Sequence, residues 1–350
     1  MKADKPLRAP TDLVDVLAIP PERLSDLERV AARYAVAITP AIAALIDPSD
    51  GADPIARQFA PDPAELVSMP QERADPVGDD AHSPVEGIVH RYPDRALLKL
   101  THVCAVYCRF CFRREMIGPQ HGKSLSPEKL AAALAYIGAH REIWEVIFSG
   151  GDPLVLSARR LAAVMRALQP VDHVKVIRFH TRVPAVDPDR ITPALLRALK
   201  ASGKAVYVVL HADHPREMSA AARRAAARIV DAGIPMLGQT VLLRGVNDDG
   251  QTLSELMRAF VESRIKPYYL HHCDLAPGTS HFRTTIEEGQ ELMRGMRGHL
   301  SGLCQPTYVL DIPGGYGKSP IGPSYVSGGG GGAFAVEDFN GTRHVYPPPE

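Results

Sequence analysis

The sequence predicts an α/β fold built on a parallel β-sheet. From about residue 95 onward, short apolar runs alternate with Ala-, Leu- and Arg-rich segments of helical periodicity. The six runs that we interpret as strands cover residues 97–101, 145–148, 174–179, 205–210, 236–243 and 266–270. Strands that alternate with helices pair in parallel through right-handed crossovers, and six such units can form either an open partial barrel or a doubly wound sheet. In both architectures, ligands bind at the carboxyl ends of the strands.

Two of the helices between these strands have clear start signals. Ser126 precedes Pro127, and Thr192 precedes Pro193. A hydroxyl at the N-cap accepts a hydrogen bond from the first turn, and proline suits the first helical position because an N–H there would have no partner within the helix. We therefore expect helices to begin at Pro127 and Pro193.

The chain divides into three parts by composition. Residues 1–88 are rich in Pro, Asp and Ala, and we interpret them as a helical and irregular N-terminal extension. Residues 89–305 carry the alternation of strands and helices, which stops in the C-terminal segment, residues 306–350. The sequence thus predicts one α/β domain with an extension on each side.

Composition and charge exclude several classes of protein. With 45% hydrophobic and 23% charged residues, the chain is an ordinary globular protein. Its 40 basic and 40 acidic residues cancel, so we expect neither nucleic acid nor a membrane as a partner. No apolar stretch has the length of a secretion signal or a membrane span, and five cysteines are too few for a disulfide framework. We expect a cytoplasmic protein.

Three of the five cysteines, Cys104, Cys108 and Cys111, lie close together just after the first predicted strand. Structural zinc needs four protein ligands, usually in two separated pairs, and the chain has no second pair. Three thiolates on a short loop can instead bind three irons of a [4Fe-4S] cluster and leave the fourth iron open. We favour the cluster; zinc with a remote fourth ligand and unliganded thiols remain as alternatives.

The spacing CxxxCxxC, with Tyr107 before the second cysteine, resembles the radical S-adenosylmethionine (SAM) superfamily, in which the open iron binds SAM. The rest of the chain, from roughly residue 38 to residue 328, resembles the lysine 2,3-aminomutases within that superfamily. The motifs that carry this resemblance, in the order of the family, are HRYPDR (90–95), CFRR (111–114), SGGDP (149–153), GVND (245–248), PYY (267–269), CDL (273–275), HFRT (281–284) and PGGYGK (313–318).

This resemblance implies a partial (β/α)6 barrel of the radical SAM type, with an N-terminal helical extension and an irregular C-terminal tail that binds pyridoxal phosphate (PLP). The implied cofactors are a [4Fe-4S] cluster on the three cysteines, SAM, and PLP bound covalently to Lys318. The residues implied to contact SAM are Ser149, Gly150, Gly151, Asp152, His211 and Gln239. The residues implied to surround PLP are Arg91, Tyr92 and Arg95, since arginines suit a phosphate and an aromatic ring can pack beside PLP.

Each of these features also has a simpler interpretation in the sequence alone. Paired glycines after a strand, as at Gly150 and Gly151, can simply form a tight turn. Polar residues at strand ends, such as His211 and Gln239, are often structural, and a lysine in a glycine-rich turn, such as Lys318, is often only solvated. The resemblance to the aminomutases is what favours the functional interpretation.

The resemblance also implies a substrate, an amino acid. Arg113 matches the arginine that pairs with the substrate carboxylate, although it could instead shield an anionic cluster. Asp274 and Asp311 match two carboxylates that receive the ε-ammonium of lysine, and a buried ammonium needs such partners. The implied reaction is the conversion of L-lysine into β-lysine, started by a radical derived from SAM. The alternatives are an aminomutase for another amino acid, supply of β-lysine for modification of elongation factor P, and a non-catalytic iron–sulfur redox or sensor protein.

Three departures from the family pattern lead to further expectations. Longer relatives carry a zinc site built from a cysteine after GVND and a C-terminal cysteine cluster, whereas this chain has Asp249 and no such cluster, so we expect no zinc. The subunit contact made by that zinc is then in doubt, and a homo-oligomer is an open expectation. Tyr316 replaces a glycine of the PLP turn, and Glu115 replaces a basic residue after Arg114. An external flavodoxin or ferredoxin is the expected electron donor.

Overall fold

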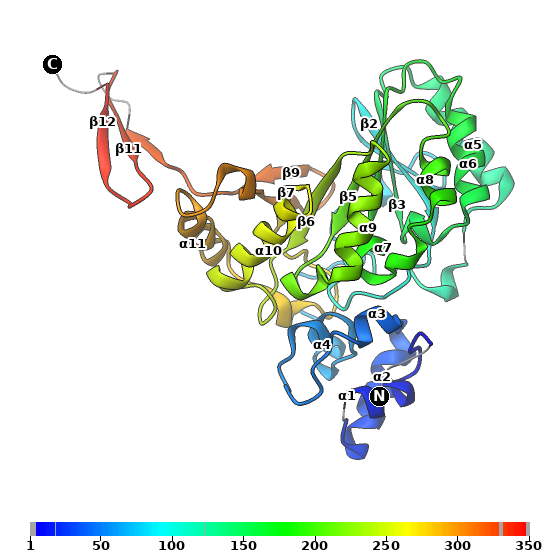
Figure 1. Cartoon of the computed structure of the whole chain (residues 1–350), viewed down its shortest axis with the longest axis horizontal. Helices are drawn as coiled ribbons and strands as arrows, with labels where there is room; N and C mark the ends of the chain where they lie inside the picture. Colours follow the sequence, from blue (N-terminus) through cyan, green and yellow to red (C-terminus); the bar gives the residue numbers. More distant parts are fainter. Residues whose placement is uncertain (1–4, 18, 123, 329–331, 348–350) are drawn as a thin grey trace.

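The fold centres on a nine-stranded sheet whose strands follow one another in chain order (Figure 1). A computed structural model describes residues 5–17, 19–122, 124–328 and 332–347. The strands are β1 (Ile88–Tyr92), β2 (Arg95–Thr101), β3 (Glu145–Gly150), β4 (Val176–Thr181), β5 (Ala205–His211), β6 (Met236–Val241), β7 (Ile265–His271), β8 (Thr307–Ile312) and β9 (Gly317–Pro320). Strands β2 to β8 are parallel, whereas β1 and β9 pair antiparallel at the two edges.

Helices follow the parallel strands, which confirms the α/β alternation expected from the sequence (Figure 1). They are α5 (Pro127–Ala139), α6 (Ala158–Leu168), α7 (Val183–Val186), α8 (Pro193–Leu199), α9 (Ala220–Asp231), α10 (Gly250–Glu262) and α11 (Ile286–Met296). The expected caps are present, because Ser126 accepts from the Lys129 N–H and Thr192 accepts from the Leu195 N–H. All six predicted strands are found.

Strand β6 shows how the sheet divides its side chains between two faces. Met236, Gly238 and Thr240 are buried, whereas Leu237, Gln239 and Val241 are half-buried. A Cβ on Gly238 would lie 2.8 Å from the ring of Phe260 in α10, so this set faces the helices. Because side chains alternate along a strand, Gln239 faces the inner side of the curved sheet.

The two edges of the sheet come together at Tyr92 and Lys318. The Lys318 N–H of β9 donates to the Tyr92 hydroxyl of β1 at 2.7 Å. Gly317 has φ +89°, and a Cβ there would lie 2.8 Å from the same hydroxyl, so this crossing requires glycine. The sheet is thereby rolled into a nearly closed barrel with Lys318 at its seam.

The C-terminal segment is more regular than the sequence suggested. Strand β8 adds a seventh parallel strand, and β9 returns along it after the PGGYG turn. The glycines of that turn masked the short strands on either side of it in the sequence. A separate antiparallel sheet of β10 (Val326–Gly328), β11 (Phe334–Glu337) and β12 (Arg343–Tyr346) extends away from the barrel (Figure 1).

The N-terminal extension lies against the barrel next to the cysteine segment (Figure 1). Its helices are α1 (Pro10–Leu17), α2 (Leu24–Arg33), α3 (Pro40–Ala43) and α4 (Pro54–Phe59). Glu65, which follows α4, is fully buried and accepts from Arg109 Nε at 3.0 Å and Nη2 at 2.6 Å, and also from Arg114. The extension thus fixes the loop that carries the cysteines. Among the described residues, no helix is long and apolar enough to cross a membrane.

Replacement of Glu65 by Gln should destabilise the chain strongly, because two buried guanidinium groups would lose their shared anion. Breaking a buried ion pair costs about 3–5 kcal/mol. The free energy of unfolding, measured by urea titration of the metal-free chain, should fall by that amount. The matched control is Glu115→Gln, because Glu115 pairs with Arg33, whose side chain is 42% exposed. This change should lower the free energy of unfolding by no more than about 1 kcal/mol.

The difference in the free energy of unfolding between the wild type and the Glu65→Gln variant should also depend on pH. Burial opposes ionisation of Glu65, but Arg109 and Arg114 together lower its pKa below the ordinary value. The stabilisation is therefore complete above the unfolded pKa of about 4.3 and is lost as the pH falls through the lower folded value. Equal stability of the Glu65→Gln variant and the wild type at neutral pH would contradict this role.

Candidate active site

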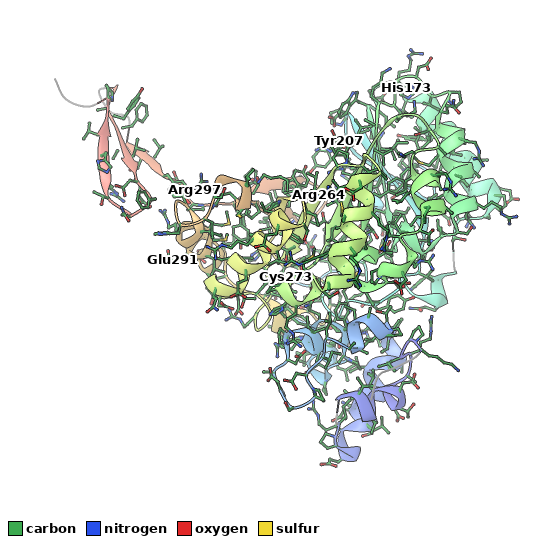
Figure 2. The ribbon with its side chains drawn as sticks, in the orientation of Figure 1. His173, Tyr207, Arg264, Cys273, Glu291 and Arg297 are labelled. Carbon is green, nitrogen blue, oxygen red and sulfur yellow. The ribbon has the colours of Figure 1, made fainter. Side chains whose placement is uncertain are left out.

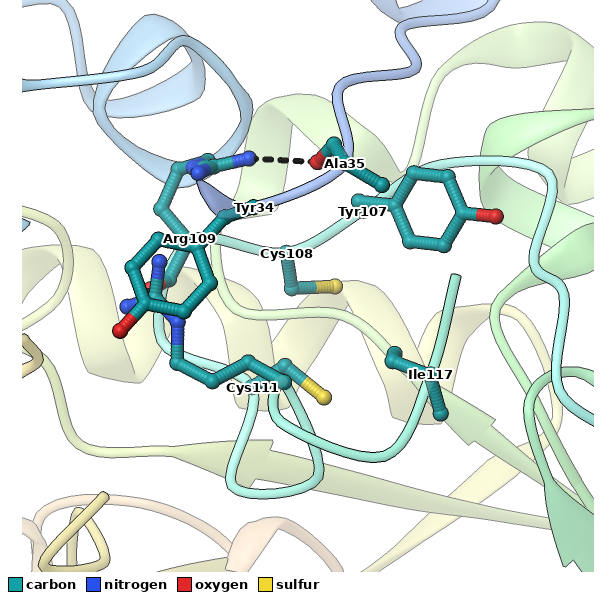
Figure 3. Close-up of a pocket in the computed structure, with 8 residues that line it drawn as sticks. Tyr34, Ala35, Tyr107, Cys108, Arg109, Cys111 and Ile117 are labelled. Carbon is teal, nitrogen blue, oxygen red and sulfur yellow. Dashed lines mark hydrogen bonds between the residues drawn. The ribbon is translucent and has the colours of Figure 1, made fainter. Parts of the chain in front are cut away.

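Cys104, Cys108 and Cys111 lie on the loop after β2, at the carboxyl end of the sheet. Cys108 and Cys111 line a pocket together with Tyr34, Ala35, Tyr107, Arg109, Arg114 and Ile117 (Figure 3). Figure 3 shows the thiols of Cys108 and Cys111 pointing to the same side. All three cysteines are free and half-buried. The loop therefore presents a set of thiols that a metal centre could share.

The distances between the three sulfur atoms differ between a zinc site and an iron–sulfur cluster. In a tetrahedral zinc site with Zn–S bonds of about 2.3 Å, the sulfur atoms lie about 4 Å apart. Among the described residues, the trio whose ligand atoms all lie within 4.8 Å is His90, His140 and Glu142, not the three cysteines. A four-iron cluster binds each sulfur through a different iron and needs wider spacing. The three cysteine sulfurs are therefore not gathered around a single ion in this structure.

The thiols need a compensating charge before they can act as ligands. Burial raises the pKa of Cys108 to about 12, and it also raises the pKa values of Cys104 and Cys111. Arg182 acts in the opposite direction and lowers the pKa of Cys108, because its Nη1 donates to the sulfur at 2.9 Å. Metal binding supplies the remaining positive charge, because the ligand is the thiolate.

Arg182 connects the cysteine loop to the barrel, and the sequence analysis did not identify it. It follows β4, and its Nη2 donates to Gln58 Oε1 at 3.0 Å and to Glu217. Asp213 lies 3.3 Å from the same nitrogen. The side chain is only 8% exposed, so it is a buried cation with three polar partners besides the sulfur. Its position just after a strand was the available signal, because functional residues gather at the carboxyl ends of parallel strands.

The SGGD segment (149–152) begins with the last two residues of β3 and packs directly on the start of the cysteine loop. Gly150 has φ +109°, and a Cβ on Gly151 would lie 2.3 Å from the Val103 carbonyl oxygen. Asp152 is buried and accepts from the Thr181 hydroxyl at 2.7 Å and from the Arg182 N–H at 2.8 Å. These glycines therefore permit a close backbone approach, and Asp152 fixes the neighbouring strand end. Ser149 accepts from Arg113 Nη1 at 3.1 Å.

His211 and Gln239 lie side by side on the inner face of the sheet. They are register partners at the ends of β5 and β6. His211 Nε2 is 3.0 Å from Asp213 Oδ1, and its ring lies 5.9 Å from that of Phe110 in the cysteine loop. The two residues are thus on the same side of the barrel as the cysteines.

Lys318 faces the two predicted acidic residues. Its Nζ donates to Asp311 Oδ1 at 2.6 Å and Oδ2 at 2.8 Å. Burial, then the charge of Asp311, raises the pKa of Asp274 to about 8, while Lys318 and Arg113 oppose the shift. Cys273, next to Asp274, lies deep in the molecule (Figure 2). The structure brings exposed Lys318, half-buried Asp274 and buried Asp311 into one charged group.

The predicted PLP residues gather around Lys318, although not as free side chains. Tyr92 accepts from the Lys318 N–H, and the guanidinium of Arg95 stacks 3.8 Å from the centre of the Tyr92 ring. Arg91 donates to Val77 O at 2.7 Å and to Asp79 at 3.1 Å. Tyr92 and Arg95 therefore form one wall of the Lys318 site, whereas Arg91 is held just outside it by Val77 and Asp79.

Asp79 links Arg91 to Arg113 and was also missed by the sequence analysis. Arg113 donates from Nε to Asp79 Oδ2 at 2.9 Å, and its Nη2 is 2.8 Å from the same oxygen. Burial would raise the pKa of Asp79, but Arg113, Lys99 and Arg91 together lower it. The carboxylate of Asp79 therefore occupies the guanidinium group of Arg113, which the sequence analysis assigned to the carboxylate of the substrate. No local motif marks Asp79, because its partners are distant in sequence.

Buried polar atoms without a partner mark the space beside Lys318. Among the described residues, these include Nε2 of His180 and Nε2 of His271. His271 Nδ1 is 3.6 Å from Asp311 Oδ2, and Lys318 contributes to lowering the pKa values of both histidines, for which burial is the main cause. Buried polar atoms are normally satisfied. These nitrogens therefore leave unused polar groups in the barrel interior.

Comparisons with known proteins show which families the chain is similar to. Residues 98–257 match the family model of the radical SAM superfamily, and residues 293–350 match that of lysine-2,3-aminomutase. The chain is 41% identical to the L-lysine 2,3-aminomutase of Clostridium subterminale over 90% of this chain and 75% of that protein. It is 39% identical to the L-lysine 2,3-aminomutase of Acetoanaerobium sticklandii over 97% of this chain and 81% of that protein.

A glutamate 2,3-aminomutase of Clostridioides difficile is also similar, at 36% identity over 86% of this chain and 70% of that protein. Among solved structures, a radical SAM methyltransferase from Sphaerobacter thermophilus has a TM-score of 0.44 and 21% identity over 64% of this chain and 68% of that chain.

Replacement of Arg182 by Lys should weaken iron binding, because one ammonium cannot serve Cys108, Gln58 and Glu217 together. We expect iron per chain after anaerobic reconstitution to fall at least severalfold, with loss of the brown absorbance. Arg190→Lys is the matched control, since Arg190 donates only to backbone carbonyls of residues 154–156 within the fold. Full iron content in Arg182→Lys would show that this arginine does not support the thiolates.

Proposed function

Because the chain belongs to the lysine 2,3-aminomutase family of radical SAM enzymes, we propose that it converts L-lysine into β-lysine by moving the amino group from C2 to C3. Membership of this family makes the protein an enzyme, and it sets aside the alternative of a non-catalytic iron–sulfur sensor. The observation that carries lysine as the substrate is the acidic pair of half-buried Asp274 and buried Asp311, of which Asp311 already accepts from the ammonium of Lys318.

Use of SAM and an iron–sulfur cluster follows from the family. We assign the cluster to Cys104, Cys108 and Cys111, with Arg182 supporting the thiolate of Cys108. The cluster supplies one electron that cleaves SAM and starts the reaction. Ser149, Gly150, Gly151 and Asp152 are assigned to the SAM side of the site. His211 and Gln239, which are adjacent in register, are assigned to the same ligand from the opposite wall.

PLP is the proposed second cofactor, and Lys318 is its covalent attachment point. When bound, PLP supplies an electron sink that lets the amino nitrogen migrate. Tyr92 and Arg95, which are in contact with each other and of which Tyr92 contacts Lys318, are the residues proposed to flank its ring and phosphate. Arg91 can join them if it exchanges Asp79 for the phosphate, which offers the same kind of acceptor. The unpartnered nitrogens of His180 and His271 support a polar ligand at this place.

The substrate is proposed to lie between two charged ends. Arg113 would bind its carboxylate, with Ser149 and Asp79 holding the guanidinium in position. Asp274 and Asp311 would bind its ε-ammonium. A substrate side chain that ends in a carboxylate would face two acidic groups and would be repelled, which disfavours glutamate although a glutamate 2,3-aminomutase is among the relatives.

The remaining assignments concern the cell. We propose that the enzyme works in the cytoplasm, takes its electron from a flavodoxin or ferredoxin, and needs no nucleic acid partner. A homo-oligomer is compatible with the projecting sheet of β10 to β12, whose exposed apolar residues include Val345 and Tyr346.

Anaerobic reconstitution with iron, sulfide, SAM, PLP and a reductant should yield β-lysine from L-lysine, identified by mass spectrometry. Glutamate, alanine and ornithine should give little or no product in parallel reactions. Lys318→Ala should bind no PLP covalently, as judged by the PLP absorbance after desalting. Product from glutamate at a rate above that from lysine would overturn the substrate assignment.

Changing Asp274 or Asp311 to Asn should separate substrate binding from SAM chemistry. Each change removes a charge that a buried ammonium needs, so kcat/KM for lysine should fall by about 10²-fold or more. Reductive cleavage of SAM without lysine should change far less. Asp231→Asn, at an exposed pair with Arg264, is the control and should leave both rates unchanged. Equal losses in both reactions would contradict the assignment.

A further inference from the structure

Lys318 and the proposed substrate ammonium compete for the same carboxylate. Asp311 and Lys318 are register partners across β8 and β9, so the backbone itself holds the two side chains together. The ammonium of Lys318 contacts both oxygens of Asp311, at 2.6 and 2.8 Å. Asp311 is buried, whereas the side chain of Lys318 is 32% exposed, so solvent reaches the lysine but hardly reaches the carboxylate.

The basic groups around Asp311 disfavour a second cation there. His271 lies 3.6 Å from Asp311, and His180, Arg178 and Arg113 add to the electrostatic field around this group. A second ammonium placed on Asp311 while Lys318 remained there would meet a like charge in a buried space. Asp274 alone does not offset it, because its own carboxyl is held toward the neutral form by burial. The ε-ammonium of free lysine can therefore bind well only when Lys318 has left.

We propose that Lys318 acts as an internal plug, occupying the ε-ammonium position in the PLP-free enzyme so that lysine binds only after PLP. This inference rests on the proposed function, and it adds an order of binding to it. The Lys318 amine, after losing a proton to solvent, condenses with the PLP aldehyde, forms a carbon–nitrogen double bond and releases water. Its nitrogen is then held by the cofactor, and Asp311 is free for the substrate.

This order has a functional consequence for a radical enzyme. A lysine bound without PLP would lie next to the SAM site with no electron sink to receive the migrating nitrogen. The plug keeps the substrate ammonium out of that incomplete site. Asp311 thus serves two ammonium groups in turn, first that of Lys318 and then that of the substrate.

The test compares ligand binding by the full chain, with its cluster reconstituted and PLP removed. Isothermal titration calorimetry with L-lysine and with L-norleucine, which lacks the ε-ammonium, measures the contribution of that group. In the wild type the two ligands should bind equally weakly. In Lys318→Ala, lysine should bind at least about tenfold tighter than in the wild type, while norleucine should not change. The double variant Lys318→Ala, Asp311→Asn should lose the gain, and Lys200→Ala, at an exposed lysine, should behave as wild type.

Two outcomes would overturn the plug. One is the same lysine affinity in Lys318→Ala and wild type, with both shown to be folded by their melting curves. The other needs no variant: a clear preference for lysine over norleucine in the PLP-free wild type would show that the position is open. Failure of the proposed function is a separate result, because it is read from β-lysine formation by the PLP-loaded wild type. A wild type that makes β-lysine but whose plug variant gains no affinity would refute the plug alone.

Discussion

A buried charge must be paired, and this constraint organises the whole site. Around the cysteine loop, Arg109 and Arg114 share Glu65, and Arg182 is held by Glu217 and Asp213 while it donates to Cys108. These contacts position the loop before any metal is present. A cluster bound by thiolates adds negative charge, and Arg182 already stands beside the sulfur to receive it. The N-terminal extension is therefore part of the active-site support.

The same constraint governs the Lys318 end of the barrel. There the chain supplies its own counter-ions: Asp79 pairs with Arg91 and Arg113, and Asp311 pairs with Lys318. These internal partners carry the same charges as the proposed ligands. Asp79 is an anion, as are the phosphate of PLP and the carboxylate of the substrate, and Lys318 carries an ammonium, as the substrate does. Binding at this end is thus an exchange of partners rather than the filling of an empty charged space. Exchange avoids the cost of leaving buried ions unpaired.

The sequence predicted the parts of this site that depend on local patterns. The spacing of Cys104, Cys108 and Cys111 predicted one loop that carries three thiols, and the barrel of the radical SAM type followed from strand–helix alternation together with the family motifs. Glu65 and Asp79 could not be predicted, because Arg109 lies 44 residues from Glu65 and Arg113 lies 34 residues from Asp79, and an isolated acidic residue resembles any surface charge. Strand β8 was missed since a glycine-rich turn follows it. His271 could have been noticed from its position at a strand end.

Transfer of hydrogen from the substrate tests the central claim most directly. L-Lysine carrying deuterium at C3 would be incubated anaerobically with the reconstituted enzyme, SAM, PLP and a reductant, and the products separated for mass spectrometry. The account predicts deuterium in the 5′-deoxyadenosyl group derived from SAM and at C2 of the β-lysine formed. Retention of all deuterium at C3 of unreacted lysine, with SAM cleaved to unlabelled 5′-deoxyadenosine, would contradict it.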